Sequence, residues 1–238
     1  HGKRALVRSA RANRNSTSSG SFNSVVPVAL ALLAMLALPS ASSAGDGNVL
    51  YLTQESAGTA LTGNSFSSDQ SDASLSRIGT LAVPATQKGD ANQADLTIVG
   101  TGGSIALNQD NASAAILGAA LGNSAAISVL GGGAASVGQV GDHNLADLVL
   151  IDGTGNISQN GNDNIAKLKL NAGVSGDIEQ TGNANLANLE VTATAANSSV
   201  TLIQNGSASY TGPYLGGASS APPITVVTNG QVTITQSQ

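Results

Sequence analysis

Apolar and polar residues alternate through the middle of the chain in one short phrase that recurs. The phrase reads QVGDHNLADLVL from Gln139, QNGNDNIAKLKL from Gln159 and QTGNANLANLEV from Gln180. An earlier copy, QKGDANQADLTI, starts at Gln87, and a truncated copy, QNGSAS, starts at Gln204. The last four starts are 20, 21 and 24 residues apart. A period of this length indicates one supersecondary unit stacked on copies of itself.

Each copy is predicted to form a strand, a turn and a second strand. Side chains on a strand alternate between two faces, so the apolar residue two positions before each Gln shares the face of that Gln. Gly and Asn or Asp come next, and these residues accept the left-handed backbone of a tight turn. The expected turn residues are Gly141, Asp142, Gly161, Asp163 and Gly182, and these aspartates and glycines are expected to act as gatekeepers against premature assembly.

After the turn, one face of the second strand carries an Asn, an Ala and two aliphatic residues. In the three best copies the aliphatic positions are Leu148, Leu150, Leu168, Leu170, Leu189 and Val191. The charged residues of these copies fall on the opposite face or in the turns, as expected if the first face is dry. The pattern predicts an all-β fold, a β-solenoid of stacked strand-turn-strand repeats. Such a stack places Asp147 beside Lys167 and Lys169 beside Glu190.

The dry face also carries amide side chains, and these need partners because a buried, unpaired polar group costs roughly 1 to 3 kcal/mol. In a stack of similar coils, each amide can bind the amides above and below it, as in the Asn and Gln ladders of cross-β structures. The alternative is that these amides flank the turns and face water. The expected ladder residues are Gln87, Asn92, Gln139, Asn144, Gln159, Asn164, Gln180, Asn185 and Gln204.

The Gln-x-Gly-x-x-Asn-x-Ala core of these copies resembles the curlin repeat, the unit of the secreted curli fibre subunits of Gram-negative bacteria. The resemblance is sharp over residues 137–191 and looser across most of 49–238. It implies an extracellular functional amyloid of β-solenoid subunits, exported through an outer-membrane pore and assembled at the cell surface in biofilm matrix, with a nucleator or partner subunit. Two positions depart from the curlin pattern. The second inward Gln is replaced by Ile98, Leu150, Leu170 or Val191, and the leading Ser is matched only at Ser198.

Residues 1–44 have the layout of a secretory signal peptide. Five basic residues precede an apolar run from Val25 to Leu38, and small residues follow as far as Ala44. The run is shorter than the about 20 residues of a membrane span; a retained anchor is the alternative. Cleavage after Ala44 leaves four basic and fourteen acidic residues, a formal charge of −10. Such a chain is expected to stay soluble during export, to avoid nucleic acid and not to insert stably into a membrane.

The periodicity is clear in the predicted repeat region, 81–208, and weaker before it. Residues 45–80 form an N-terminal segment with weak repeats, which opens with an alternating strand ending at Gln54. A Ser- and Asp-rich stretch follows. It is expected to be a loop or a decayed copy that starts at Gln70.

Three further segments interrupt or end the repeats. Residues 110–133 are rich in Ala and Gly, which allows a helix at 112–121, although degenerate coils with a bend at Gly131-Gly132-Gly133 are the expectation. Residues 209–223 are expected to be a loop, because Pro213 cannot donate a hydrogen bond to a strand neighbour. Residues 224–238 alternate around Asn229-Gly230 and predict either a capping hairpin or a final strand of the stack.

Composition and motifs argue against an enzyme. Aromatic residues make up 2% of the chain and Trp is absent, which suits a thin solenoid better than a large globular core. Cysteine is absent and histidine occurs only at His1 and His143, so no catalytic triad, metal site or cofactor is expected. We expect a secreted structural subunit that self-assembles into fibres. The alternative is a capped, soluble β-solenoid adhesin that does not polymerise.

Overall fold

The structure is a computed structural model. It describes residues 5–8, 47–56, 63–111, 122–171, 173–193, 197–207, 210–211 and 224–237. The expectations for the rest of the signal peptide, for 112–121 and for most of 209–223 therefore lie outside the described residues. The described part of the chain contains strands and no helix, and so no helix that could cross a membrane.

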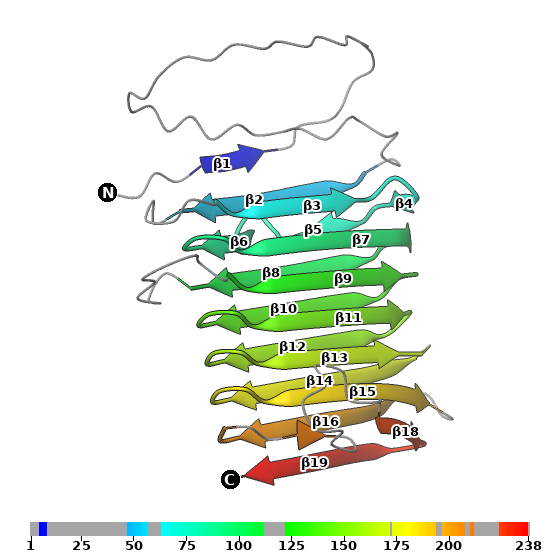
Figure 1. Ribbon diagram of the computed structural model, residues 1–238. Coiled ribbons are helices and arrows are strands. Elements are labelled where there is room, and N and C mark those ends of the chain that lie inside the picture. Colours follow the sequence, from blue (N-terminus) through cyan, green and yellow to red (C-terminus); the bar gives the residue numbers. More distant parts are fainter. Residues whose placement is uncertain are drawn as a thin grey trace, which may run out of the picture.

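The strands form two parallel sheets that face each other, which confirms the predicted all-β solenoid (Figure 1). We call the ten-stranded sheet the incoming sheet; its strands are β1 (Ala5–Arg8), β2 (Val49–Glu55), β5 (Arg77–Ile78), β6 (Ala85–Lys88), β8 (Ser104–Asp110), β10 (Ala134–Val140), β12 (Thr154–Asn160), β14 (Val174–Thr181), β16 (Ser198–Asn205) and β19 (Gln231–Ser237). The nine-stranded outgoing sheet contains β3 (Ser65–Asp69), β4 (Ala73–Ser74), β7 (Gln93–Thr101), β9 (Ser124–Leu130), β11 (Leu145–Ile151), β13 (Ile165–Leu170), β15 (Leu186–Ala193), β17 (Tyr210–Thr211) and β18 (Ile224–Thr228).

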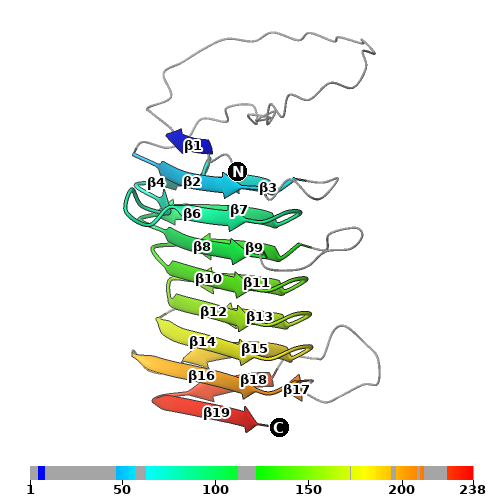
Figure 2. The same ribbon diagram turned by 90° about the vertical axis from the view of Figure 1, so that its left-hand side faces the viewer.

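Each coil contributes a strand to both sheets, and successive coils stack in register. Gln139 of β10 lies beside Gln159 of β12, and Leu148 of β11 lies beside Leu168 of β13. The pairings between coils are parallel, whereas β1 pairs antiparallel with β2. Figure 2 shows the coils from β2 to β19 stacked along one axis. Equivalent residues of neighbouring copies therefore lie directly over one another.

The stack begins earlier than the predicted repeat region. In 45–80, β2 pairs with β5 and β6 of the next coil, which places Gln54 beside Gln87. The Ser- and Asp-rich stretch contains β3, which pairs with β7. Gln70 does not start a copy; its Nε2 donates to Ser76 Oγ at 2.8 Å. Residues 45–80 thus contain a complete first coil.

The C-terminal segment forms the last strands of the stack and not a hairpin. β18 pairs with β15, and β19 pairs with β16, so the Asn229-Gly230 turn joins strands of different sheets. In this arrangement the two strands cover two open sheet edges. A hairpin would pair them with each other and leave those edges bare.

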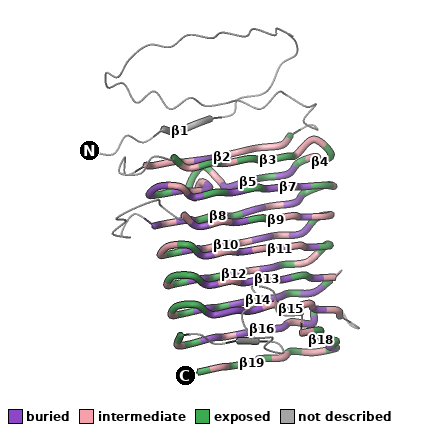
Figure 3. Tube along the Cα trace, viewed as in Figure 1, coloured by how far each residue is buried: buried purple, intermediate pink, exposed green. Residues whose placement is uncertain are grey.

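The space between the sheets is filled by buried aliphatic residues, and Figure 3 shows buried and exposed positions alternating along the strands. Large residues face small ones across this interior. A Cβ atom added at Gly155 would lie 2.9 Å from Leu150 Cδ2, and one at Gly176 would lie 2.6 Å from Leu170 Cδ2. The leucines of the outgoing sheet therefore fit because the incoming sheet has glycine opposite them.

Candidate functional site

The glutamines near the ends of the incoming strands form one continuous hydrogen-bonded column. Gln139 Nε2 donates to Gln159 Oε1 at 2.9 Å, and Gln159 Nε2 donates to Gln180 Oε1 at 2.9 Å. The column contains Gln54, Gln87, Gln109, Gln139, Gln159, Gln180, Gln204 and Gln236, and each donates to the next along the chain. Gln159 Nε2 also donates to the backbone oxygen of Leu145 at 3.0 Å. This second bond holds the amide nitrogen of Gln159 on the side of the outgoing strand. It thereby fixes the direction of the column, in which each Gln donates to the next Gln along the chain.

The asparagines that follow the turns form a second buried column, and it donates in the opposite direction. Asn164 Nδ2 donates to Asn144 Oδ1 at 3.0 Å and to the Gly182 carbonyl oxygen at 2.8 Å. Asn144 Oδ1 also accepts the backbone N–H of Asn164 at 3.1 Å. The same contacts link Asn185 to Asn164 and Asn144 to Asn123. These amides are at most 1% exposed and bonded on both sides, so their burial leaves no unpaired group.

The glycine two positions after Gln139, Gln159 and Gln180 is required both by the turn and by the stacking. Gly141, Gly161 and Gly182 have φ angles of +107°, +135° and +112°, a region that favours glycine. A Cβ atom on Gly161 would lie 1.9 Å from the Gly182 carbonyl oxygen. That oxygen is the acceptor for Asn164 Nδ2. The turn glycines thus allow the coils to approach closely enough for the asparagine column to form.

The aliphatic residues predicted to face inward lie in two columns of the outgoing sheet. The first contains Leu96, Ile127, Leu148, Leu168 and Leu189, and the second contains Ile98, Val129, Leu150, Leu170 and Val191. Each of these side chains is at most 1% exposed. The two columns form the hydrophobic core along the outgoing sheet.

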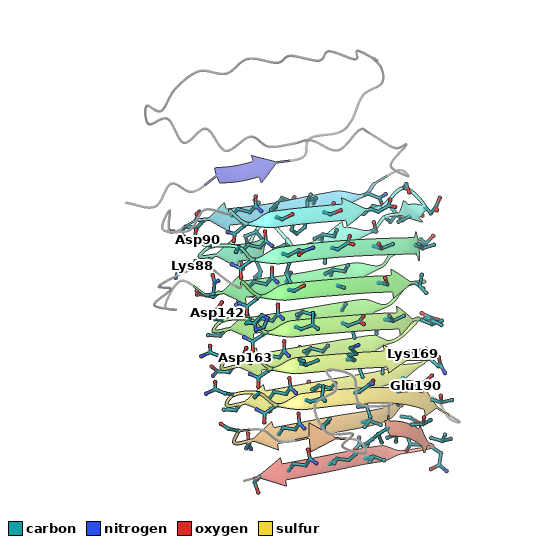
Figure 4. The ribbon with its side chains drawn as sticks, in the orientation of Figure 1. Lys88, Asp90, Asp142, Asp163, Lys169 and Glu190 are labelled. Carbon is teal, nitrogen blue, oxygen red and sulfur yellow. The ribbon has the colours of Figure 1, made fainter. Side chains whose placement is uncertain are left out.

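The charged side chains of the middle coils lie outside this core. Figure 4 shows Lys169 and Glu190 on neighbouring outgoing strands, and Lys169 Nζ is 2.9 Å from Glu190 Oε1. Asp147 lies beside Lys167 in the register of the same sheet. Both pairs were predicted from the repeat. At this exposure such a pair contributes at most about 1 kcal/mol.

The turn aspartates lie along one lateral edge of the stack, and Figure 4 labels Asp142 and Asp163 there. Asp163 Oδ1 is 2.6 Å from His143 Nδ1, and both side chains are more than half exposed. Asp90 occupies the equivalent turn of an earlier coil, but it is buried and accepts a hydrogen bond from the Ser56 hydroxyl. The turn carboxylate at this edge is therefore buried in the coil that contains Asp90 and exposed in the middle coils.

Several members of the two columns were not assigned from the sequence. Gln54, Gln109 and Gln236 each follow an apolar residue by two positions, but no Gly comes two positions later. Asn64 and Asn123 follow longer connections than the four residues that separate Gln139 from Asn144. The usable signal was the Asn-x-Ala-x-Ile pattern from Asn123, which matches the second half of the repeat.

Asn111 maintains the asparagine column where the third coil has no turn glycine. Asn92 Nδ2 donates to Asn111 Oδ1 at 3.1 Å, in place of the glycine carbonyl that Asn144 and Asn164 use. Asn111 Nδ2 donates to the backbone oxygen of Asp90 at 2.8 Å. A side-chain amide thus substitutes for a backbone carbonyl beside the 112–121 segment.

The two ends of the stack are the places where this arrangement can be extended. In the described part of the chain, no strand pairs with the outer edges of β18 and β19. The inward residues Val232 and Ile234 of β19 are half-buried, whereas Val200 and Leu202 in β16 are buried. The first coil likewise has a half-buried inward residue, Leu50.

The hydroxyl and the backbone N–H of Ser71 donate to Asp69 on β3 and lower the pKa of that exposed carboxyl group.

Among the described residues, no group of three or more His, Asp or Glu side chains could hold a metal ion. Comparison with known protein families, curated proteins and solved structures finds no match to this chain.

Proposed function

We propose that this chain is a secreted structural subunit that self-assembles into curli-like extracellular fibres for adhesion and biofilm matrix. The observation that carries the proposal is the Gln column, which runs through the stack to a last strand whose outer edge no described strand covers. Val232 and Ile234 on that strand are only half-buried. A strand edge of this kind is a template for pairing with another chain.

A docked copy would repeat contacts that already hold the coils together. It would add backbone hydrogen bonds to the outer edge of β19 and an aliphatic residue next to Ile234. Within the chain, the same kinds of contact join β19 to β16. The joint between copies is therefore chemically similar to the interface between coils, as in cross-β and solenoid assemblies.

The proposed gatekeeper role of Asp142 and Asp163 is limited by where these residues lie. Both are in turns of middle coils, at the lateral edge and away from β19 (Figure 4). In the folded chain they face neither end of the stack. Their charge would therefore act on the unfolded chain or on side-by-side contacts, as charged residues next to aggregating strands do.

Export and location are part of the same proposal. A leader at 1–44 would direct the chain out of the cell, through an outer-membrane secretion pore, and a nucleator or partner subunit would start fibres at the cell surface. The basic residues before the apolar run and the formal charge of −10 on the remainder support this route. The proposal involves no enzyme activity, cofactor, nucleic acid or stable membrane insertion.

Thioflavin fluorescence and fibre diffraction test the proposal on two matched variants of β19. Ile234→Lys places a charge on the inward face, and Thr235→Lys places the same charge on the exposed face of the same strand. We expect the wild type and T235K to form fibres with a reflection at about 4.7 to 4.8 Å, and I234K to remain unassembled. A wild-type chain that stays monomeric at micromolar concentration, without this reflection, would refute self-assembly.

The alternative function, a capped adhesin, is favoured by one surface feature. The segment 80–84 protrudes beside a groove of about 460 Å³ on the incoming sheet, and its Leu81 and Val83 are 64% and 66% exposed. Exposed apolar side chains next to a groove are typical of binding sites. Under this alternative, deleting 211–238 would cause a monomeric protein to aggregate, whereas a fibre subunit would still assemble at a changed rate.

A further inference from the structure

The C-terminal end of the stack is half a coil. β19 lies in the incoming sheet and pairs with β16, while the last outgoing strand, β18, pairs with β15 one coil earlier. No described strand of the outgoing sheet follows β18 to cover the inward face of β19. The exposure shows the consequence: Val232 and Ile234 are half-buried, although Val200 and Leu202 beside them are 1% and 0% exposed.

A head-to-tail neighbour does not fill this half coil. At the other end of the stack, β2 and β3 belong to one coil, and the outer edge of β2 is free only once β1, which lies in the proposed leader, is removed. If β2 of a second copy paired with β19, β3 of that copy would lie one strand too far from β18. One strand position in the outgoing sheet would then stay empty, with apolar side chains facing it.

We infer that the half coil is completed by the half coil of a second copy, through a two-fold axis parallel to the strands. This operation places the second copy's β19 in the empty position next to β18, and places β19 of the first copy next to the second copy's β18. β18 and β19 run in opposite directions, because the chain reverses at Asn229-Gly230. The strands that meet between the copies are therefore antiparallel, and both vacancies close at once.

The side chains match in this arrangement. Val226 and Val232 are each three residues from Asn229, and Ile224 and Ile234 are each five residues from it. All four are inward residues that pack partly against the core. The two-fold axis keeps the distance from the turn, so the second copy's Val232 lies next to Val226 and its Ile234 lies next to Ile224. The aliphatic columns then continue across the joint.

The distribution of charge favours this end over the other. Residues 191–238 contain no charged side chain, so β18 and β19 bring no charged side chains to the joint. A two-fold joint at the first coil would instead bring together two copies of Glu55 and Asp69, on β2 and β3. This inference rests on the proposed self-association and specifies its first contact, a pair of chains joined at β18 and β19. Both first coils are then outermost, so a fibre would extend from the pair through contacts between first coils, which these carboxylates make weaker.

Disulfide trapping tests this geometry, because the chain has no cysteine of its own. Thr225 and Thr233 are both exposed and both four residues from Asn229. Within one copy they lie on opposite outer faces, since β18 and β19 are in different sheets. In the two-fold pair each Thr225 is directly opposite the second copy's Thr233, with Cβ atoms about 4.5 to 5.5 Å apart. That spacing is close enough for a disulfide after a small adjustment.

We expect the double variant T225C/T233C to give a covalent dimer on a non-reducing gel under mild oxidation, and the single variants T225C and T233C to give none. Sedimentation of the wild-type chain should show a dimer before any fibre appears. Cross-linking by either single variant, or none by a folded double variant that still self-associates, would overturn the two-fold joint. Thioflavin fluorescence is measured separately and reports fibre formation. Fibres that form without the cross-link would refute the two-fold joint but leave the proposed function standing. Cross-linked dimers that form no fibres would refute fibre assembly but support the two-fold joint.

Discussion

Replacing Asn144 with alanine tests whether the buried amide column stabilises the coils. The change removes the Nδ2 bonds to Asn123 Oδ1 and to the Gly161 carbonyl oxygen, at 3.0 and 2.8 Å. It also removes Oδ1 as the acceptor for the backbone N–H and the Nδ2 of Asn164, at 3.1 and 3.0 Å. The Asn164 N–H and the Gly161 oxygen lose these partners in a dry interior. At roughly 1 to 3 kcal/mol for each group, the expected loss is about 2 to 6 kcal/mol in the free energy of unfolding.

Urea unfolding followed by circular dichroism measures this loss, because the midpoint falls in proportion to stability. The matched control is Asn162→Ala in the neighbouring turn. Asn162 is exposed, and its Oδ1 accepts the Asp142 N–H at 2.8 Å, a bond that water can replace. We expect N162A to cost less than about 1 kcal/mol.

Asn144→Asp separates hydrogen bonding from packing. Aspartate keeps the volume of the side chain but removes both Nδ2 donors and places oxygen against the Asn123 and Gly161 oxygens. We expect N144D to lose at least as much stability as N144A. If N144A and N162A cost the same, or if N144D restores the wild-type midpoint, the amide column does not stabilise the fold in the way described.

Three further substitutions test other parts of the stack, each by urea unfolding. Gly161→Ala should destabilise by more than about 1 kcal/mol and broaden the transition, because its Cβ would lie 1.9 Å from the Gly182 oxygen at a φ of +135°; a wild-type midpoint would contradict the close stacking of turns. Leu168→Ala should cost about 2 to 5 kcal/mol, because this side chain is 1% exposed in the aliphatic column; a cost below that range would mean that the core is loosely packed. Glu190→Gln removes the pair with Lys169 at 2.9 Å and should cost at most about 1 kcal/mol. The cost should shrink further in high salt, so a larger, salt-independent loss would be evidence against an exposed pair.

The middle of the fold could be predicted from the alternation of side chains between the two faces of each strand. Alternation put Gln159 and Asn164 on the same face as the aliphatic residues, and their low exposure shows that both face the interior. This alternation could not reveal which residue of one sheet lies opposite which residue of the other sheet across the interior. The match of Gly155 with Leu150 depends on where the turn places the two strands, and this placement emerges only from the three-dimensional fold.

The irregular coils were harder to predict, because their connections differ in length. Asn123 belongs to the column, but the segment 112–121 separates it from Gln109 and hides the repeat spacing. The Asn229-Gly230 turn misled in another way, since this dipeptide is the usual sign of a hairpin. Here the strands on either side of it pair with β15 and β16, because two open sheet edges were already present to receive them.

The opposite donor directions of the two amide columns have an electrostatic consequence. A column of amides that all point the same way adds up its dipoles, as the peptide groups of an α-helix do. In this chain the Gln column points toward the C-terminal end and the Asn column toward the N-terminal end. The two dipoles oppose each other along the same axis, so their sum stays small as coils are added. A long stack of such coils can therefore grow without accumulating partial charge at its tips.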